Sequence, residues 1–353
     1  MQKKEKLVIV LCAIATVAAG ILHYAEANAV VAFGVTAVAL ALLAMIVGDA
    51  TEQLGSRLGP GATGILQSGL GNLPELFVAI FALRAGLAHV VQAALVGSIL
   101  GNSLLVFGLA LFFGGLKNGT QRFKSEPPRM IATLMLLAVS ALIVPTLAKE
   151  LHTPAEPHIN KLDIVVAIIL LVVLAASIYF SVKGDPAVAT QKEEMGEHHA
   201  QWPMSLTLGV LAAAGAGAAF VSDWFVEALQ PAMKTLGITE TFAGLVVVAI
   251  AGNAIENLIG IQLAWRNQAD YAVSVILNSS LQIALGLFPM LVLLSFVLGG
   301  SILTFVLSPL LVVALALAAL VSAFVVFDGE SIWLEGLSLI GLYAIIAAAF
   351  WWG

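Results

Sequence analysis

Two acidic residues recur in the same short context within stretches that are otherwise apolar. Glu75 ends the run GNLPE and Glu256 ends GNAIE, and Gly252 follows Gly71 by 181 positions. An ionisable side chain at bilayer depth costs roughly 2.5–3.5 kcal/mol on insertion scales, so its presence there indicates a function. On a helix the Asn and Glu of each motif, three residues apart, face the same way. Each motif therefore predicts a carboxylate and an amide directed at one point.

Further polar side chains follow both motifs within apolar stretches. They are Ser98 and Asn102 after the first motif, and Ser279 and Gln282 after the second. Together with carbonyls freed where Gly and Pro weaken the motif helices, these groups offer only oxygen ligands, which suit a hard cation such as Ca²⁺. The six histidines lie in predicted loops or at the ends of predicted segments, and Cys12 lies in the first segment. This placement disfavours a softer metal at the site. The serines could instead bond the preceding helical turn, and the amides could join neighbouring helices.

Charge suggests how such a site would work. No Lys or Arg accompanies Glu75 or Glu256 at the same depth. Two buried carboxylates need neutralisation, and either one Ca²⁺ or two protons supply it. Suppose that the site can switch between the two faces of the membrane only when its charge is neutralised. Competition between the metal and protons for the site then produces antiport. The predicted metal ligands are Glu75, Glu256, Asn72, Asn253, Ser98, Ser279, Asn102 and Gln282. No catalytic residue and no resident cofactor is predicted, so the protein is not expected to be an enzyme.

The elements that hold these residues follow from composition. The chain has 353 residues, of which 61% are hydrophobic and 10% charged, and its mean hydropathy is +1.05. Soluble chains carry about 25% charged residues. The fold class predicted is therefore an all-α polytopic membrane protein with the lipid bilayer as its partner. No basic run suits a nucleic acid, and one cysteine excludes an internal disulfide.

Apolar segments long enough to cross a bilayer as helices number eleven. They are 7–23, 29–47, 61–83, 90–113, 129–148, 162–182, 204–222, 241–265, 271–298, 302–327 and 333–352. The first is interpreted as a retained helix rather than a signal peptide, because no small-residue cleavage site ends it. With the N-terminus inside, eleven of the fifteen Lys and Arg residues fall on the cytoplasmic side. We expect a multi-pass protein of a prokaryotic cytoplasmic membrane, with its C-terminus outside.

The motif repeat divides the chain. We expect an N-terminal helix (1–27), a first five-helix repeat (28–182), an acidic and His-containing cytoplasmic linker (183–203) and a second five-helix repeat (204–353). Because five is odd, the second repeat enters the membrane inverted, which places a site near the midplane between broken helices. The linker is either a solvated connection or a cation-sensing segment. Four acids near the predicted membrane edges are either interfacial charges or an access path for cations: Asp49, Glu52, Asp223 and Glu227.

The motif regions resemble a known family. Residues 71–117 and 244–285 are similar to the first and second signature repeats of the cation/proton exchangers, proton-coupled calcium antiporters of the calcium/cation antiporter superfamily. The resemblance implies eleven helices, Ca²⁺ movement driven by protons, and Glu75 and Glu256 as the central carriers, with the other predicted ligands in support. Sodium-coupled relatives usually show a GTSLPE-like first motif, whereas GN and SSLQ here favour proton coupling. Departures are Asn257 in place of the usual His, Leu73 in place of Ala, and Gln67–Gly69 before the first motif.

Three other functions are weighed against proton-coupled antiport. A Na⁺-coupled exchanger or one of broader divalent specificity would use a similar oxygen site. A passive cation channel could also use two glutamates, but inverted halves with broken helices favour alternating access over a fixed pore. An intramembrane hydrolase would need a nucleophile or metal motif, and the predicted spans contain none. The stoichiometry and oligomeric state stay open.

Overall fold

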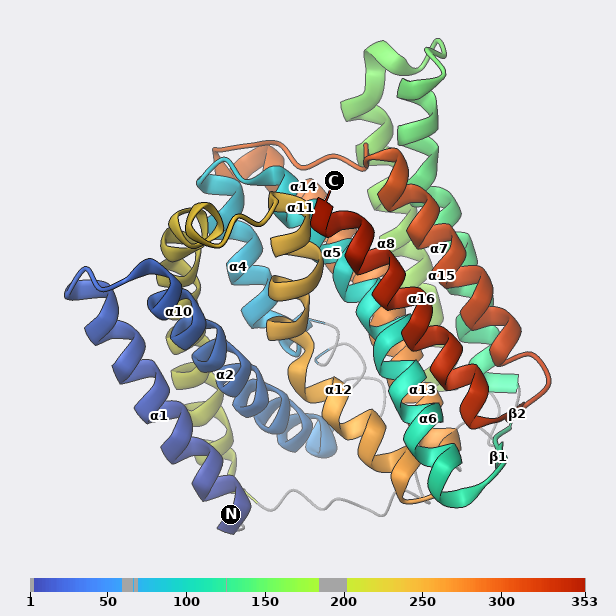
Figure 1. The fold of residues 1–353 in the computed structure, drawn as a ribbon, viewed down its shortest axis with the longest axis horizontal. Helices are drawn as coiled ribbons and strands as arrows, with labels where there is room; N and C mark the ends of the chain where they lie inside the picture. Colours follow the sequence, from blue (N-terminus) through green and yellow to red (C-terminus); the bar gives the residue numbers. More distant parts are fainter. Residues whose placement is uncertain (1–2, 59–65, 67–68, 125, 184–201, 353) are drawn as a thin grey trace. The chain divides into compact units, whose positions relative to one another are not determined.

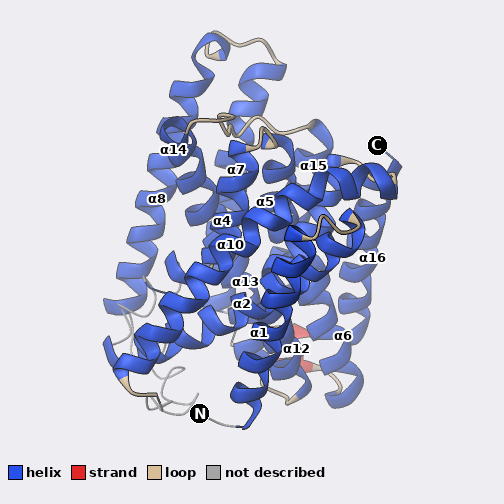
Figure 2. Cartoon of the chain, turned by 90° about the vertical axis from the view of Figure 1, so that its left-hand side faces the viewer, coloured by secondary structure: helices blue, strands red, loops and turns tan. Residues whose placement is uncertain are grey.

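The structure, a computed structural model, describes residues 3–58, 66, 69–124, 126–183 and 202–352. Helix dominates, and the described strands are two residues long (Figure 2). The first half contains α1 (Lys3–Tyr24), α2 (Ala29–Leu58), α4 (Leu73–Arg84), α5 (Ala88–Leu100), the π-helical turn η1 (Gly101–Val106), α6 (Phe107–Asn118), β1 (Gln121–Arg122), α7 (Glu126–Glu150), the short η2 (Glu156–His158) and α8 (Ile159–Lys183). The second half contains α10 (Met204–Leu236), α11 (Glu240–Phe242), the π-helical η3 (Ala243–Val248), α12 (Ala249–Trp265), α13 (Ala269–Gln282), the π-helical η4 (Ile283–Leu287), α14 (Phe288–Leu298), α15 (Pro309–Val325), β2 (Glu330–Ser331) and α16 (Trp333–Trp352).

Membrane-spanning helices account for most of the described chain. Eight are long and apolar enough to cross a bilayer, and a ninth arises if the bent pair 240–253 and 258–265 forms one span. The predicted segments 61–83 and 302–327 correspond to the shorter helices α4 and α15, although residues 59–65, 67 and 68 lie outside the described part. The predicted all-α polytopic class is confirmed. Several boundaries were wrong. Helix α2 continues past residue 47 to Leu58, and α10 continues past residue 222 to Leu236. Residues 302–308 are not helical, so α15 begins only at Pro309.

The helices, which are labelled in Figure 1, group into two compact units. The first comprises residues 1–85 and 172–237, and the second comprises residues 86–171 and 238–353. In the first unit α2 packs along α10, with α1 and α4 also against α10. In the second unit α5 packs on η3 and α12, while α6 packs on α12 and α16. Each unit thus combines helices from both halves of the sequence, and the predicted repeat boundaries stay a prediction.

The repeat detected from the motifs extends to the order of the helical elements. An offset of 181 carries the start of α5 at Ala88 onto the start of α13 at Ala269. The same offset carries Gly101, where η1 begins, onto Gln282, one residue before η4. Each half therefore has an α-helix interrupted by one wide π-helical turn at the same place. Such turns inside α-helices are rare and are frequent at functional sites.

Paired glycines allow helices of the second unit to touch backbone to backbone. A Cβ at Gly97 of α5 would lie 2.2 Å from the Leu245 carbonyl oxygen of η3, and one at Gly244 would lie 2.5 Å from the Val90 carbonyl oxygen. Gly108 of α6 and Gly336 of α16 form a second reciprocal pair, where a Cβ on either would lie within 2.8 Å of the partner's carbonyl oxygen. Small residues at crossings are how helices in lipid gain close packing.

An extended strap, residues 299–308, joins α14 to α15. Leu303, Phe305 and Leu307 bury their side chains while the residues between them are partly exposed, which is the period of a strand. No strand pairs with the strap among the described residues, and polar side chains of four helices take that place. Its backbone bonds to Gln92 Nε2 at 2.9 and 3.1 Å, Thr146 Oγ1 at 2.9 and 3.0 Å, Asp163 Oδ1 at 3.4 Å and Ser295 Oγ at 3.0 Å.

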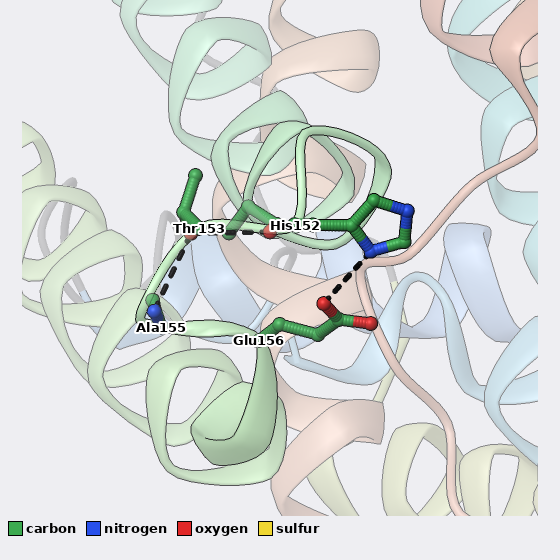
Figure 3. Close-up of polar contacts among 5 residues, drawn as sticks. His152, Thr153, Ala155 and Glu156 are labelled. Carbon is green, nitrogen blue, oxygen red and sulfur yellow. Dashed lines mark hydrogen bonds and ion pairs between the residues drawn. The ribbon is translucent and has the colours of Figure 1, made fainter.

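The turn between α7 and α8 is closed by its own side chains, as Figure 3 shows. His152, with φ of 49°, places Nδ1 3.0 Å from Glu156 Oε2. Thr153 Oγ1 donates to the Ala148 carbonyl at 3.1 Å. At the other end of α7, β1 and β2 pair antiparallel, with Gln121 opposite Ser331. These local contacts fix the ends of the helices that frame the strap.

Candidate functional site

The first motif lies where a new helix begins. Gly71 and Asn72 form a turn, α4 starts at Leu73, and Pro74 occupies its first turn. The Asn72 carbonyl accepts the first intrahelical bond from Leu76 N at 2.9 Å, but the Asn72 side chain does not cap the helix. Glu75 is therefore in the first turn of α4, where the unpaired N–H groups of a helix favour a negative charge. The helix break predicted at this motif is confirmed.

The second motif lies at a bend. The helical stretches 240–253 and 258–265 meet at an angle of 63°. Gly252 and Asn253 end the first stretch, and Glu256 falls at the bend of α12, between the two stretches. The side chains of residues 254–257 lie outside the described residues, so the placement of the Glu256 carboxylate stays a prediction, as does the effect of Asn257. The interruption predicted at this motif is present as a bend, within a helix whose backbone is continuous from Ala249 to Trp265.

Four of the predicted ligands meet in one buried cluster of the second unit. Ser98 of α5, Asn102 of η1, Asn253 of α12 and Ser279 of α13 are each at most 6% exposed. Asn102 Nδ2 donates to Ser279 Oγ at 3.0 Å and to Asn253 Oδ1 at 3.4 Å. Asn253 Nδ2 donates to Ser98 Oγ at 2.8 Å and to the Ala249 carbonyl at 3.0 Å. Each amide thus reaches a serine of the other sequence repeat.

The remaining predicted ligands divide between the units. Gln282 is the last residue of α13, directly before η4, and is 9% exposed, but none of the bonds that join the four-residue cluster involves it. Asn72, which is buried, and Glu75, which is half-buried, belong to the first unit. The predicted ligands whose side chains are described in the second unit therefore offer amide and hydroxyl oxygens without charge. Among the described residues, no group of three or more His, Cys, Asp or Glu side chains is arranged to hold a metal.

Sequence reasoning missed a second layer of hydroxyls behind the cluster. Ser103 Oγ lies 3.1 Å from Ser280 Oγ, and Ser322 Oγ donates to the Ser103 carbonyl at 3.0 Å. A cavity of about 10 Å³ beside Ser103 and Ser322 is otherwise lined by apolar side chains, and this volume is near the smallest that holds one water. A signal existed in the sequence, because Ser103 and Ser280 each directly follow a predicted ligand.

The acids predicted near the membrane edges all fall in the first unit, on α2 and α10, which pack together. One of them, Glu227, places Oε2 3.4 Å from His23 Nδ1, and the His23 ring stacks on Trp224 with centroids 5.4 Å apart. This contact ties α1 to α10 and gives Glu227 a local structural partner. An access path for cations along these acids stays a prediction. Most of the 183–203 linker, residues 184–201, lies outside the described residues.

Comparison with known proteins places these features in context. A family model described as sodium/calcium exchanger protein matches residues 28–183 and 206–352. The Ca²⁺/H⁺ antiporter of Synechocystis sp. is 37% identical over 339 residues, which cover 90% of each chain. The Ca²⁺/H⁺ antiporter ChaA of Bacillus subtilis is 36% identical over 343 residues, which cover 95% of each chain.

Solved structures show the same likeness. The structure of native YfkE superposes with a TM-score of 0.84 at 31% identity, covering 98% of this chain and 100% of that one. The crystal structure of an H⁺/Ca²⁺ exchanger CAX superposes with a TM-score of 0.69 at 16% identity, covering 99% and 92%, which is a likeness of fold alone. Both relatives and structures thus match nearly the whole length of the chain.

Proposed function

Because the chain belongs to the sodium/calcium exchanger protein family, we propose that it exchanges Ca²⁺ for protons across a membrane. The observation that carries this proposal is the buried cluster of Ser98, Asn102, Asn253 and Ser279. Its oxygens come from both sequence repeats, and Asn253 belongs to the same motif as Glu256. Relatives named Ca²⁺/H⁺ antiporters support the choice of ions.

Glu75 and Glu256 are the carriers in this proposal. Glu75 stands in the first turn of α4 and Glu256 at the bend of α12. One Ca²⁺ or two protons neutralise the two carboxylates, so metal and protons compete for the same oxygens. The hydroxyl and amide oxygens of the cluster, with Asn72 and Gln282, would complete the six to eight oxygen ligands that Ca²⁺ takes.

Transport would proceed by alternating access. The non-helical turn at 71–72 is tolerated at membrane depth only inside protein or along a wet cavity, and the 63° bend between 253 and 258 marks the matching point of the second repeat. Both features support an ion path at these points. The excess of Lys and Arg in the predicted inner loops gives the orientation proposed, with the N-terminus in the cytoplasm and the C-terminus outside. Protons entering the cell would then drive Ca²⁺ out.

Purified protein in proteoliposomes tests the proposal, with a Ca²⁺ indicator and a pH-sensitive dye read together. We expect a proton gradient to drive Ca²⁺ the opposite way. Glu75→Gln or Glu256→Gln should each lower that rate on the order of 100-fold, as expected when a group that carries the ion is neutralised. Glu150→Gln, at the exposed end of α7, is the matched control and should transport like the wild type. An unaltered rate in both motif variants would contradict the proposal.

The same vesicles separate the alternative functions. Ca²⁺ movement that follows a Na⁺ gradient and ignores the pH gradient would identify a sodium-coupled exchanger. Ca²⁺ movement without any counterflow of protons or Na⁺ would identify a passive channel. Competition by Mn²⁺ in the same vesicles reports how broad the divalent specificity is.

A further inference from the structure

Both amides of the buried cluster turn their nitrogen atoms toward the candidate ligands. The orientation follows from one backbone group, because Asn253 contacts the Ala249 carbonyl at 3.0 Å and a carbonyl oxygen can only accept. The contacting atom is therefore Nδ2, which also donates to Ser98 Oγ at 2.8 Å. This leaves Asn253 Oδ1 facing Asn102. The Asn102 atom at 3.4 Å from that oxygen must then be the donor Nδ2.

This orientation is suited to a cluster without a cation. Asn102 Nδ2 donates to Ser279 Oγ and to Asn253 Oδ1, two oxygens that Ca²⁺ would coordinate. Ca²⁺ lies 2.3–2.6 Å from its ligand oxygens. An ion bound there would face the positively polarised N–H groups of Asn102. Asn102 therefore blocks the same oxygens that the proposed function assigns to the metal.

The two asparagines differ in how firmly they are held. Asn253 is anchored to the backbone of its own helix, four residues back, as well as to Ser98. Asn102 donates only to side chains of the cluster, and one of its two bonds is long at 3.4 Å. A half-turn of an amide about its last side-chain bond exchanges oxygen for nitrogen with no backbone movement, and that torsion is soft. Asn102 is thus the member that can turn.

Resting on the proposed function, we propose that Asn102 is a two-state amide that senses whether the cation is bound. Without the cation, Nδ2 donates to Ser279 and Asn253. With the cation bound, the amide turns and Oδ1 faces the ion, while Asn253 keeps its orientation. Cation binding therefore breaks the two hydrogen bonds that Asn102 donates in the empty cluster. That cost lowers the affinity for the ion and allows it to be released after the site has changed sides.

Side-chain amide spectra of the wild-type protein, labelled with ¹⁵N-asparagine, test this directly. Ca²⁺ added to saturation should move the Asn102 amide signals and leave the Asn253 signals in place. Asn102→Asp and Asn253→Asp identify each pair of signals by its disappearance. Asn102 signals that stay where they are in saturating Ca²⁺ would overturn the inference, and so would equal movement of both pairs.

Two double-mutant cycles give an independent measurement. One pairs Asn102→Ala with Ser279→Ala, and its internal control pairs Asn253→Ala with Ser98→Ala. Without Ca²⁺, both cycles should show a coupling of about 2–4 °C in the unfolding midpoint. In saturating Ca²⁺ the 102–279 coupling should change more than the 253–98 coupling, because only Asn102 exchanges its hydrogen bonds for a contact with the ion. Equal changes in the two couplings would count against the inference.

Failure of this inference can be told from failure of the proposed function. A wild-type protein that binds no Ca²⁺ would overturn both. A wild-type protein that exchanges Ca²⁺ for protons, but whose Asn102 amide does not respond to the ion, would overturn the two-state amide alone.

Discussion

The two copies of the Gly-Asn-x-x-Glu motif interrupt their helices in different ways. In the first copy the chain turns at Gly71 and Asn72, and a new helix begins at Leu73. In the second copy helical backbone runs through the motif and changes direction by 63°. The motif asparagines differ as well, because Asn253 bonds Ser98 and the Ala249 carbonyl whereas the Asn72 side chain leaves its helix uncapped.

One residue type explains much of this difference. The offset of 181 places Pro74 opposite Ile255. Proline has no N–H to donate and a fixed φ, so it favours the first turn of a helix and opposes the interior of one. Isoleucine keeps its N–H, which allows the second helix to continue through its bend. Sequence repeats can therefore preserve the chemistry of a site while the local backbone of each copy differs.

The largest expected effect is a loss of stability where α5 packs against η3, the segment that leads into the second motif. In Gly97→Ala the new Cβ would lie 2.2 Å from the Leu245 carbonyl oxygen and 2.5 Å from Leu245 Cα, so the backbone of η3, which leads into α12, must shift. We expect a loss of about 3 kcal/mol in the free energy of unfolding, measured as a lower thermal midpoint. Gly101→Ala, where nothing lies within 4 Å of the added atom, is the control and should be neutral. Equal stability of the two variants would contradict this packing.

Exchanging the residues that distinguish the two copies should have the next largest effect. Ile255→Pro should convert the bend into a break and cost about 2 kcal/mol, less than the full helix-interior penalty because the helix is already bent. Pro74→Ile removes only a preference for starting α4 and should cost about 0.5 kcal/mol. Thermal midpoints and transport rates of both variants measure the difference. A larger loss of stability or transport rate in Pro74→Ile than in Ile255→Pro would show that the break before α4 and the bend of α12 do not differ as described.

The smallest expected effect is the difference in the free energy of unfolding between alanine variants of the two motif asparagines. Asn253→Ala removes hydrogen bonds to a serine and a carbonyl in a buried cluster and should cost about 1–2 kcal/mol. Asn72→Ala removes no helix cap and should cost about 0.5 kcal/mol or less. Unfolding midpoints without Ca²⁺ isolate this structural effect from ion binding. Similar losses in both variants would mean that Asn72 has a structural role equal to that of Asn253.

Much of the fold could be predicted from apolar periodicity and the repeated motif. The first signature repeat and its counterpart at 244–285 indicated the cation/proton exchangers, and the relatives confirm that resemblance. The break before α4 followed from Gly71 and Pro74, and the bend of α12 lies at Gly252, where glycine weakens a helix. For the site, the sequence named the four residues of the buried cluster because polar side chains are scarce in apolar spans.

Other features depend on contacts that a sequence does not display. The direction of the Asn102 and Asn253 amides is set by Ala249, a backbone group with no sequence signal. The π-helical turns η1, η3 and η4 are not marked by any residue type in the sequence. The extended strap was missed for a different reason, since its residues are as apolar as those of a helix. Ser308 and Pro309 did mark the true start of α15, as a side-chain cap and a first-turn proline.

That strap has a consequence for how the chain avoids wrong partners. A segment with alternating buried and exposed residues and unpaired backbone groups is a template onto which another extended chain can add. Here Gln92, Thr146, Asp163 and Ser295 occupy N–H and carbonyl groups from Leu303 to Leu307. The helices thus act as a neighbouring strand made of side chains, and in the folded protein they leave these backbone groups of the strap unavailable to another extended chain.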